Sequence, residues 1–292
     1  MKIEGIIPAM VTPFTAEGEV DEAGLRALVR RLLAGGVHGL FPTGSTGEAY
    51  VLTHAERERV IAAVAEETAG RVPVMAGAGL PSTRESIRAA RAAERAGADA
   101  LSVIVPAFVP PSAEELYAHF AAIADSVSIP TLLYNHPLRT QITIPPEVVT
   151  RLTAAHNVIG IKDSSGQLAL TMSYIAAGPA GFGVMAGMDS LILATLVMGG
   201  SGAVAASAGI FPEKVVAVYE RYRAGDLEGA RKAQYALHPL RQVFAMGTFP
   251  AVIKEALAQI GHPAGPVRGP AGPLGEADRR RLAAILARLR EA

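Results

Sequence analysis

Cysteine is absent from the 292 residues of the sequence, and this absence excludes three kinds of chemistry. Without a thiol the chain forms no disulfide, holds no thiolate-bound metal and has no cysteine nucleophile. An excess of charge of one sign is also lacking, since 27 Lys and Arg residues balance 27 Asp and Glu residues. No basic face is therefore indicated for nucleic acid or for an anionic membrane surface.

Long uninterrupted hydrophobic runs are missing too, although 50% of the residues are hydrophobic. The longest apolar stretches contain glycine or polar residues and fall short of a membrane span. The N-terminus has no apolar run behind a basic cluster, so no signal peptide is expected. These features predict a soluble cytoplasmic protein, and the length suits one barrel-sized domain with a small extension.

Short apolar or β-branched runs alternate with longer segments of helical period up to about residue 224. The expected strands lie at residues 6–11, 37–41, 72–75, 100–105, 131–134, 158–161, 183–186 and 202–205. Each is followed by a helical pattern, and no hairpin signal separates them. Eight strand–helix units in this order predict an α/β fold, a (β/α)8 TIM barrel whose parallel sheet closes on itself.

Helix starts are marked by three predicted capping boxes, in which a Ser or Thr is followed three residues later by Glu. The pairs are Thr53 with Glu56, Ser82 with Glu85, and Ser112 with Glu115. In this motif each side chain hydrogen-bonds the backbone N–H of the other residue. We interpret all three as purely structural.

The alternation stops near residue 225. Helical patterns follow at about 226–246, 250–260 and 276–290, and residues 261–275 are rich in Gly and Pro. We therefore divide the chain into a barrel domain at 1–224, expected to be catalytic, and a C-terminal helical extension at 225–292. The extension is expected to pack on the barrel or on a neighbouring subunit.

Polar residues gather just after the expected strands, which is where enzymes with this barrel carry their active sites. Residues 44–48 read Gly-Ser-Thr-Gly-Glu, residues 134–137 read Tyr-Asn-His-Pro, and Lys162 ends the run at 158–161. Since these strand ends meet at one face of a barrel, we expect one polar site there.

Lys162 is the candidate nucleophile. Lysine is scarce, and this is the one lysine between Lys2 and Lys214. A dry barrel mouth disfavours the ammonium and favours the free amine. That amine can attack a ketone and form an imine, which helps to make or break the adjacent carbon–carbon bond. The alternative is a strand-end lysine that reaches solvent or pairs with Asp163.

Tyr134 and Arg139 are candidate supports for this chemistry. The Tyr134 phenol can shuttle a proton, or it can be a packed aromatic with a satisfied hydroxyl. The Arg139 guanidinium can bind a carboxylate with its planar fork, or it can form a loop salt bridge. Position alone leaves both pairs of alternatives open.

The loop after the second expected strand is a candidate anion site. Gly44 and Gly47 flank the hydroxyls of Ser45 and Thr46, and successive backbone N–H groups in such a turn suit a carboxylate or phosphate oxygen. The spacing does not match a P-loop. The alternative is an ordinary turn.

The remaining polar groups point to no metal. The 7 histidines show no ligand-like spacing, so no metal site is predicted, and only His136 lies beside the expected site. Asp163, Asp189 and Glu48 are interpreted as groups that cap helices or orient their neighbours.

The chain resembles the dihydrodipicolinate synthase and N-acetylneuraminate lyase family over essentially its whole length. The family's markers are a Gly-(Ser/Thr)-Thr-Gly-Glu loop, a Tyr-Asn-x-Pro segment and a strand-end lysine. They occur here in the same order at 44–48, at 134–137 and at Lys162. Three motifs in register are far more specific than any one of them.

The resemblance implies roles for individual residues. By this match Lys162 forms the imine with pyruvate, Tyr134 handles proton transfers, and Ser45 and Thr46 bind the pyruvate carboxylate. The backbone of Val204 is implied to lie beside the keto acid. No cofactor and no metal are implied besides the covalent lysine imine, and family members are usually tetramers built as dimers of tight dimers.

The identity of the second substrate depends on three further positions. In the family's synthases, a tyrosine contributed across the tight dimer completes a proton relay, but Phe108 stands there and has no hydroxyl. Ser45, at the middle of the relay, matches the sialic acid lyases. Arg139 instead fits the synthases, where it holds the carboxylate of aspartate semialdehyde, although Gln141 replaces the usual glycine.

We therefore predict a pyruvate-dependent aldolase or lyase that cleaves or forms a carbon–carbon bond in a 2-oxo acid. N-acetylneuraminate and 2-keto-3-deoxy sugar acids are the substrates we expect first. The alternatives are a 4-hydroxy-tetrahydrodipicolinate synthase of lysine biosynthesis, which joins pyruvate and aspartate semialdehyde, and a dehydratase that uses the same imine. A non-catalytic 2-oxo acid binding protein is the alternative from another class.

Overall fold

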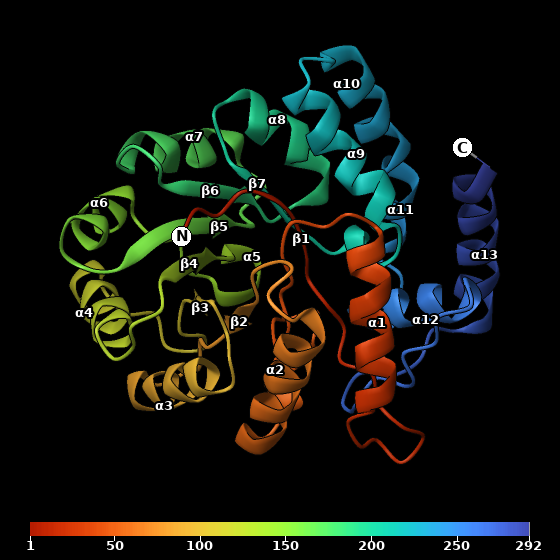
Figure 1. The fold of residues 1–292 in the computed structure, drawn as a ribbon, viewed down its shortest axis with the longest axis horizontal. Helices are drawn as coiled ribbons and strands as arrows, with labels where there is room; N and C mark the ends of the chain where they lie inside the picture. Colours follow the sequence, from red (N-terminus) through yellow and green to blue (C-terminus); the bar gives the residue numbers. More distant parts are fainter. Residues whose placement is uncertain (292) are drawn as a thin grey trace.

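Seven parallel strands form one curled sheet in the computed structural model of the protein, which describes residues 1–291 (Figure 1). The strands are β1 (Gly5–Pro8), β2 (Met75–Gly77), β3 (Ala100–Ile104), β4 (Thr131–Asn135), β5 (Val158–Asp163), β6 (Gly183–Ala186) and β7 (Gly202–Ala205). Their order in the sheet is β1-β7-β6-β5-β4-β3-β2. Each predicted strand except the one at 37–41 overlaps a strand of the structure, although β2 shares only Met75 with the range predicted at 72–75.

The exception is the segment predicted as a strand at 37–41, which forms only isolated parallel bridges. Phe41 pairs with Ala9 next to β1, and Leu40 pairs with Val74 next to β2. The pairing is too short for a regular strand, so the expectation of eight strands is met only in part. These bridges nevertheless lie between the two edge strands of the sheet.

Helices surround the sheet, as the ring of coils in Figure 1 shows. The barrel helices are α1 (Glu22–Ala34), α2 (His54–Thr68), α3 (Thr83–Arg95), α4 (Ala113–Ala124), α5 (Pro137–Thr140), α6 (Pro146–Ala155), α7 (Leu168–Ala177), α8 (Ile192–Val197) and α9 (Pro212–Arg223). Short 3-10 turns lie at Ala49–Val51, Asp189–Leu191 and Ser207–Gly209. Inside the sheet, apolar side chains such as Ile7, Leu132 and Met185 pack together, so the interior is filled rather than open.

Two of the three predicted capping boxes are complete. Thr53 at the start of α2 and Ser112 at the start of α4 each exchange both bonds with the Glu three residues later. At the start of α3, the Ser82 side chain accepts from the amide of Glu85 at 3.2 Å. The Glu85 carboxylate lies 2.8 Å from His54 Nε2, so this carboxylate pairs with a neighbouring helix.

The C-terminal region is helical, as predicted, but its first helix is broken. The expected helix at 226–246 is α10 (Leu227–Ala236) followed by α11 (His238–Val243), with Pro239 in the first turn of α11. Proline has no N–H to donate to the preceding turn, so the helix restarts there. The last helices are α12 (Ala251–Gln259) and α13 (Glu276–Glu291).

The C-terminal helices share a hydrophobic core with the start of the barrel. Leu25 and Leu32 of α1 belong to the same buried cluster as Leu240, Val252 and Leu286. Figure 1 shows α12 beside α1, with α13 at the outer edge. No helix within residues 1–291 is both long and apolar enough to cross a bilayer.

Candidate active site

Lys162 and Tyr134 lie side by side at the ends of neighbouring strands. The register of β4 and β5 sets Tyr134 opposite Lys162 and Asn135 opposite Asp163. The Lys162 Nζ atom lies 4.0 Å from the centroid of the Tyr134 ring and 5.0 Å from that of the Phe41 ring. Lys162 and Tyr134 are each only 4% exposed. The amine therefore lies in an aromatic setting with little access to water.

Asp163 does not pair with this amine, because other groups occupy its carboxylate. Oδ1 accepts from Asn135 Nδ2 at 2.9 Å and from the Ser165 amide at 3.0 Å. Oδ2 accepts from Ser165 Oγ at 2.9 Å and from Thr171 Oγ1 at 2.7 Å. The lysine ion pairs found in residues 1–291 belong to positions 2, 232 and 254. Lys162 is thus a buried amine with no carboxylate partner among these residues.

The phenol of Tyr134 is tuned by the same surroundings. Burial raises the pKa of Tyr134, but the charge of Lys162 and the nearby side chains of Ser45, Ser164 and Lys162 outweigh burial and lower the pKa below its ordinary value. A phenol with a lowered pKa gives up its proton more readily, which is what a proton shuttle needs.

A tight loop at residues 43–48 carries Ser45 and Thr46 to the same face. Its end residues Thr43 and Glu48 have φ values of 53° and 54°, in the left-handed region that non-glycine residues seldom adopt. Gly77 on β2 donates its amide to Thr43 Oγ1 at 3.0 Å. A Cβ at Gly77 would lie 2.1 Å from the Thr43 carbonyl oxygen, so this approach requires glycine.

The loop presents a row of free backbone donors. Within residues 1–291, the amides at positions 44–47 donate to no protein acceptor. Consecutive unpaired N–H groups attract the oxygens of an anion. The arrangement can bind a carboxylate, as the candidate anion site predicts.

A cavity of about 480 Å³ lies beside the Lys162 amine. Its lining includes six of the predicted site residues, namely Ser45, Thr46, Tyr134, Arg139, Lys162 and Val204. Residues from β4, β5 and β7, from α5 and from the loop at 43–48 therefore meet at one cavity. This is the single polar site at the strand ends that the sequence predicts.

A second, more apolar cavity of about 400 Å³ meets the first at Ser45, Tyr134 and Arg139. Gly44 lines this second cavity together with Ile104. Tyr134 therefore lines both cavities.

Two predicted site residues line neither cavity. The carbonyl of Gly47 accepts from Thr12 Oγ1 at 2.7 Å, so this residue anchors the loop. Phe108, on the loop between β3 and α4, is 98% exposed and has φ 85°. The family resemblance places this residue at a contact with a second copy of the chain. Within a single chain it lines neither cavity.

Several lining residues were missed in the sequence. Ser164 contacts Tyr134, and its place two residues after Lys162 was an available signal. Arg241, Phe244 and Phe249 belong to the C-terminal region. The guanidinium of Arg139 lies 5.1 Å from the centroid of the Phe249 ring. No local pattern indicates that this distant region reaches the strand ends.

His136 adds no positive charge to the cavity at neutral pH. Burial, and then the positive charges of Lys162 and Arg139, lower the pKa of His136 to about 4. Its ring centroid lies 5.7 Å from that of Tyr134. Within residues 1–291, no group of three or more His, Asp or Glu side chains is arranged to hold a metal ion.

A parallel α/β sheet with a buried lysine and a tyrosine at adjoining strand ends defines the class: the protein is a lyase of the class I aldolase type. The sequence profile of the Dihydrodipicolinate synthetase family matches residues 2–289. The chain belongs to this family.

Curated relatives agree with this assignment. The chain is 42% identical over 271 residues to the 4-hydroxy-tetrahydrodipicolinate synthase of Methanopyrus kandleri, covering 92% of this chain and 90% of the relative. It is 40% identical over 286 residues to the enzyme of that name from Methanoculleus marisnigri, covering 97% and 98% of the two chains.

Solved structures are similar over the whole chain. A crystal structure of a dihydrodipicolinate synthase aligns with a TM-score of 0.95 and 35% identity, over 99% of this chain and 100% of the other. A second is the prophage protein YagE of E. coli, a member of the same family determined in complex with pyruvate. It aligns with a TM-score of 0.96 and 36% identity, over 99% of both chains.

Proposed function

We propose that the protein is a 4-hydroxy-tetrahydrodipicolinate synthase that joins pyruvate to aspartate semialdehyde through an imine on Lys162. The observation that carries the proposal is the buried Lys162 amine, which lies 4.0 Å from the Tyr134 ring centroid and has no carboxylate partner in residues 1–291. The sequence ranks a sugar-acid lyase first. Two curated relatives at 42% and 40% identity carry the synthase name, and they reverse that ranking.

The reaction begins at the amine. Once Lys162 has lost its proton, its lone pair attacks C2 of pyruvate. The carbonyl oxygen takes a proton from the Tyr134 phenol, and the nitrogen returns a proton to the phenolate. Loss of water gives the imine, and loss of a proton from C3 gives the enamine. C3 then attacks the aldehyde carbon of the second substrate, whose oxygen becomes a hydroxyl. The amino group of the semialdehyde then attacks the imine carbon, which closes the ring of the product and displaces the Lys162 amine.

The two carboxylates have separate binding groups in this proposal. The free amides at 44–47 and the hydroxyls of Ser45 and Thr46 bind the pyruvate carboxylate, with the Val204 backbone alongside. Arg139 binds the carboxylate of the semialdehyde with its planar fork. A Cβ at Gly44 would lie 2.9 Å from the Phe41 ring and one at Gly47 would lie 3.1 Å from the Met10 carbonyl oxygen, so both positions leave little room for a side chain.

We also propose a homotetramer, a dimer of dimers, in which Phe108 meets a second copy of the chain. The support is an apolar loop that faces solvent in the single chain, with Phe108 98% and Val109 68% exposed.

We further propose that residues 37–41 complete a (β/α)8 barrel. The catalytic barrel then spans 1–224 and the helical extension spans 225–292. A cytoplasmic location stays a prediction.

Phe108 also supports a second candidate, a lyase acting on N-acetylneuraminate or a 2-keto-3-deoxy sugar acid. A phenylalanine cannot pass on a proton, and losing a positioned acid or base lowers rates by roughly 10²–10⁴-fold. A reaction that does not use this relay hydroxyl would be unaffected by the substitution.

Two measurements test the proposal. Borohydride added with pyruvate should reduce the imine and leave a stable adduct, found by mass spectrometry on a peptide with Lys162. A purely binding protein would gain no adduct. Pyruvate consumption is then followed with aspartate semialdehyde, N-acetylmannosamine, glyceraldehyde or glyoxylate. The synthase should consume pyruvate efficiently with aspartate semialdehyde, and turnover with a sugar aldehyde alone would favour the lyase.

A further inference from the structure

The loop that carries Ser45 and Thr46 is held in an unusual backbone shape at both ends. Thr43 and Glu48 each adopt the left-handed region, with φ of 53° and 54°. Non-glycine residues stay in that region only when their surroundings hold them there. Thr43 is held by Gly77, within the barrel. The contacts of Glu48 come from a different part of the chain.

The Glu48 carboxylate is fully buried and is bound by two groups from the C-terminal region. Lys254 Nζ on α12 lies 2.7 Å from Glu48 Oε1, and the two side chains are 3% and 0% exposed. The backbone amide of Arg268 donates to Glu48 Oε2 at 2.9 Å. Lys254 Nζ also donates to the Pro266 carbonyl at 2.7 Å. We call Glu48, Lys254 and Arg268 the Glu48 link.

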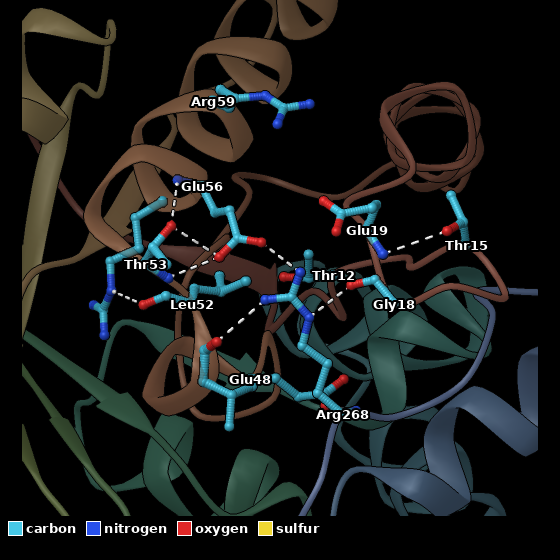
Figure 2. Close-up of polar contacts among 12 residues, drawn as sticks. Thr12, Thr15, Gly18, Glu19, Glu48, Leu52, Thr53, Glu56, Arg59 and Arg268 are labelled. Atoms are coloured by element: carbon cyan, nitrogen blue, oxygen red, sulfur yellow. Dashed lines mark hydrogen bonds and ion pairs between the residues drawn. The ribbon is translucent and has the colours of Figure 1, made fainter.

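The side chain of Arg268 extends the link to the segments around the loop (Figure 2). Its Nε donates to the Gly18 carbonyl at 2.8 Å and its Nη1 to the Val51 carbonyl at 3.2 Å. Its Nη2 pairs with the carboxylate of Glu56, which caps α2. The residues that follow the loop are therefore held by the same arginine.

A buried ion pair adds little net stability, because the free-energy cost of removing two charges from water offsets most of their attraction. Apolar side chains of similar size would fill the same space and fold as well. What the charged pair adds is direction, because Glu48 keeps both its ion pair with Lys254 and its hydrogen bond from the Arg268 amide only when the carboxylate points at both groups. The link therefore fixes the end of the loop that presents the pyruvate-binding groups.

We propose that Glu48 and Lys254 are positioning residues through which the C-terminal extension orients the loop at 43–48 for pyruvate. The inference rests on the proposed function, because the loop is taken to bind the pyruvate carboxylate. Neither residue lines the main cavity, so each acts through Ser45 and Thr46. A small displacement of these groups weakens capture of the keto acid.

The test measures imine formation as a function of pyruvate concentration, by borohydride trapping and mass spectrometry. Each variant is compared as a folded protein in the same oligomeric state as the wild type. Glu48→Gln and Lys254→Met should raise the half-saturating pyruvate concentration roughly 10-fold to 100-fold, as expected for misplaced binding groups. Arg279→Gln is the matched control. It removes a 2.9 Å ion pair with Glu255 between α13 and α12 that does not contact the loop, and it should keep the wild-type value.

The double variant Glu48→Gln/Lys254→Met covers the case in which a single variant does not fold, because it leaves no unpaired charge. It should fold and still need more pyruvate than wild type. A wild-type half-saturating concentration in the double variant, or in a folded single variant, would overturn the inference while leaving the proposed function intact. If the wild type itself forms no adduct, both are wrong.

Discussion

Two lysines within residues 1–291 are buried, and they have nearly the same exposure but different partners. Lys162 is 4% exposed and Lys254 is 3% exposed. Lys254 is bound by the Glu48 carboxylate and by a backbone carbonyl. Lys162 has the rings of Tyr134 and Phe41 and a cavity. Burial alone therefore does not distinguish the two lysines, whereas the missing carboxylate and the adjacent cavity do.

The pKa of Lys254 reflects both its burial and its carboxylate partner. Burial lowers the pKa of Lys254 to about 8, although the hydrogen bond and the charge of Glu48 oppose the change. Near neutral pH this lysine remains largely the ammonium that Glu48 needs. An ammonium has no lone pair to attack a ketone, and Lys254 lines neither cavity at the strand ends, so this lysine is suited to hold structure.

The largest expected effects are the loss of turnover in Lys162→Ala and the loss of stability in Lys254→Met. Lys162→Ala should lower turnover by at least about 10⁴-fold, because the nucleophile is gone, while its fold is kept. Lys254→Met should unfold more easily by about 3–5 kcal/mol, because one charge of a buried pair is left without its partner. Steady-state rates and urea unfolding distinguish the two. Undiminished turnover in a folded Lys162→Ala variant would show that Lys162 is not the nucleophile.

The next effect concerns the phenol beside Lys162. Tyr134→Phe should slow imine formation by roughly 10²–10⁴-fold, the contribution of a positioned proton donor. The rate of borohydride trapping at saturating pyruvate measures it.

Tyr174→Phe is a suitable control for that measurement. Its hydroxyl is also buried and donates to the Ile144 carbonyl at 2.7 Å, but it lines neither cavity at the strand ends. Its removal should cost about 1–3 kcal/mol of stability and leave the trapping rate unchanged. Equal rates in the Tyr134 and Tyr174 variants would remove the proton-shuttle role from Tyr134.

The smallest effect concerns a paired carboxylate at the edge of the Glu48 link. The hydrogen bond from Arg268 lowers the pKa of Glu56 to about 2. The stability this carboxylate contributes is complete above its ordinary pKa and is lost as the pH falls through about 2. Glu56→Gln keeps a capping side chain and removes the charge.

Urea unfolding of wild type and Glu56→Gln across a pH series measures this contribution. We expect a difference of about 1.5–3 kcal/mol at pH 7, which is the range for hydrogen bonds to charged groups. The difference should shrink as the solution is acidified. A difference that stays constant down to acidic pH would show that the charge of Glu56 contributes nothing.

Local patterns predict what lies at the strand ends of this protein and fail for contacts between distant segments. Lys162 and Tyr134 were predictable because alternating apolar runs place both at ends of neighbouring strands. The strand at 37–41 was predicted too long, because apolar character does not fix how many residues pair. Nothing near Glu48 indicates that its carboxylate meets Lys254, since a buried acid looks the same in sequence whichever distant cation it binds.

The order of synthesis gives the Glu48 link a further consequence. Arg268 follows Glu48 by 220 residues, so we expect the loop at 43–48 to reach its final shape only after nearly the whole chain has left the ribosome. Contacts between such distant residues form late, because closing so large a loop costs entropy before it brings any gain. A nascent barrel with every strand in place would still lack a settled substrate pocket. We therefore expect activity to appear only when the chain is complete.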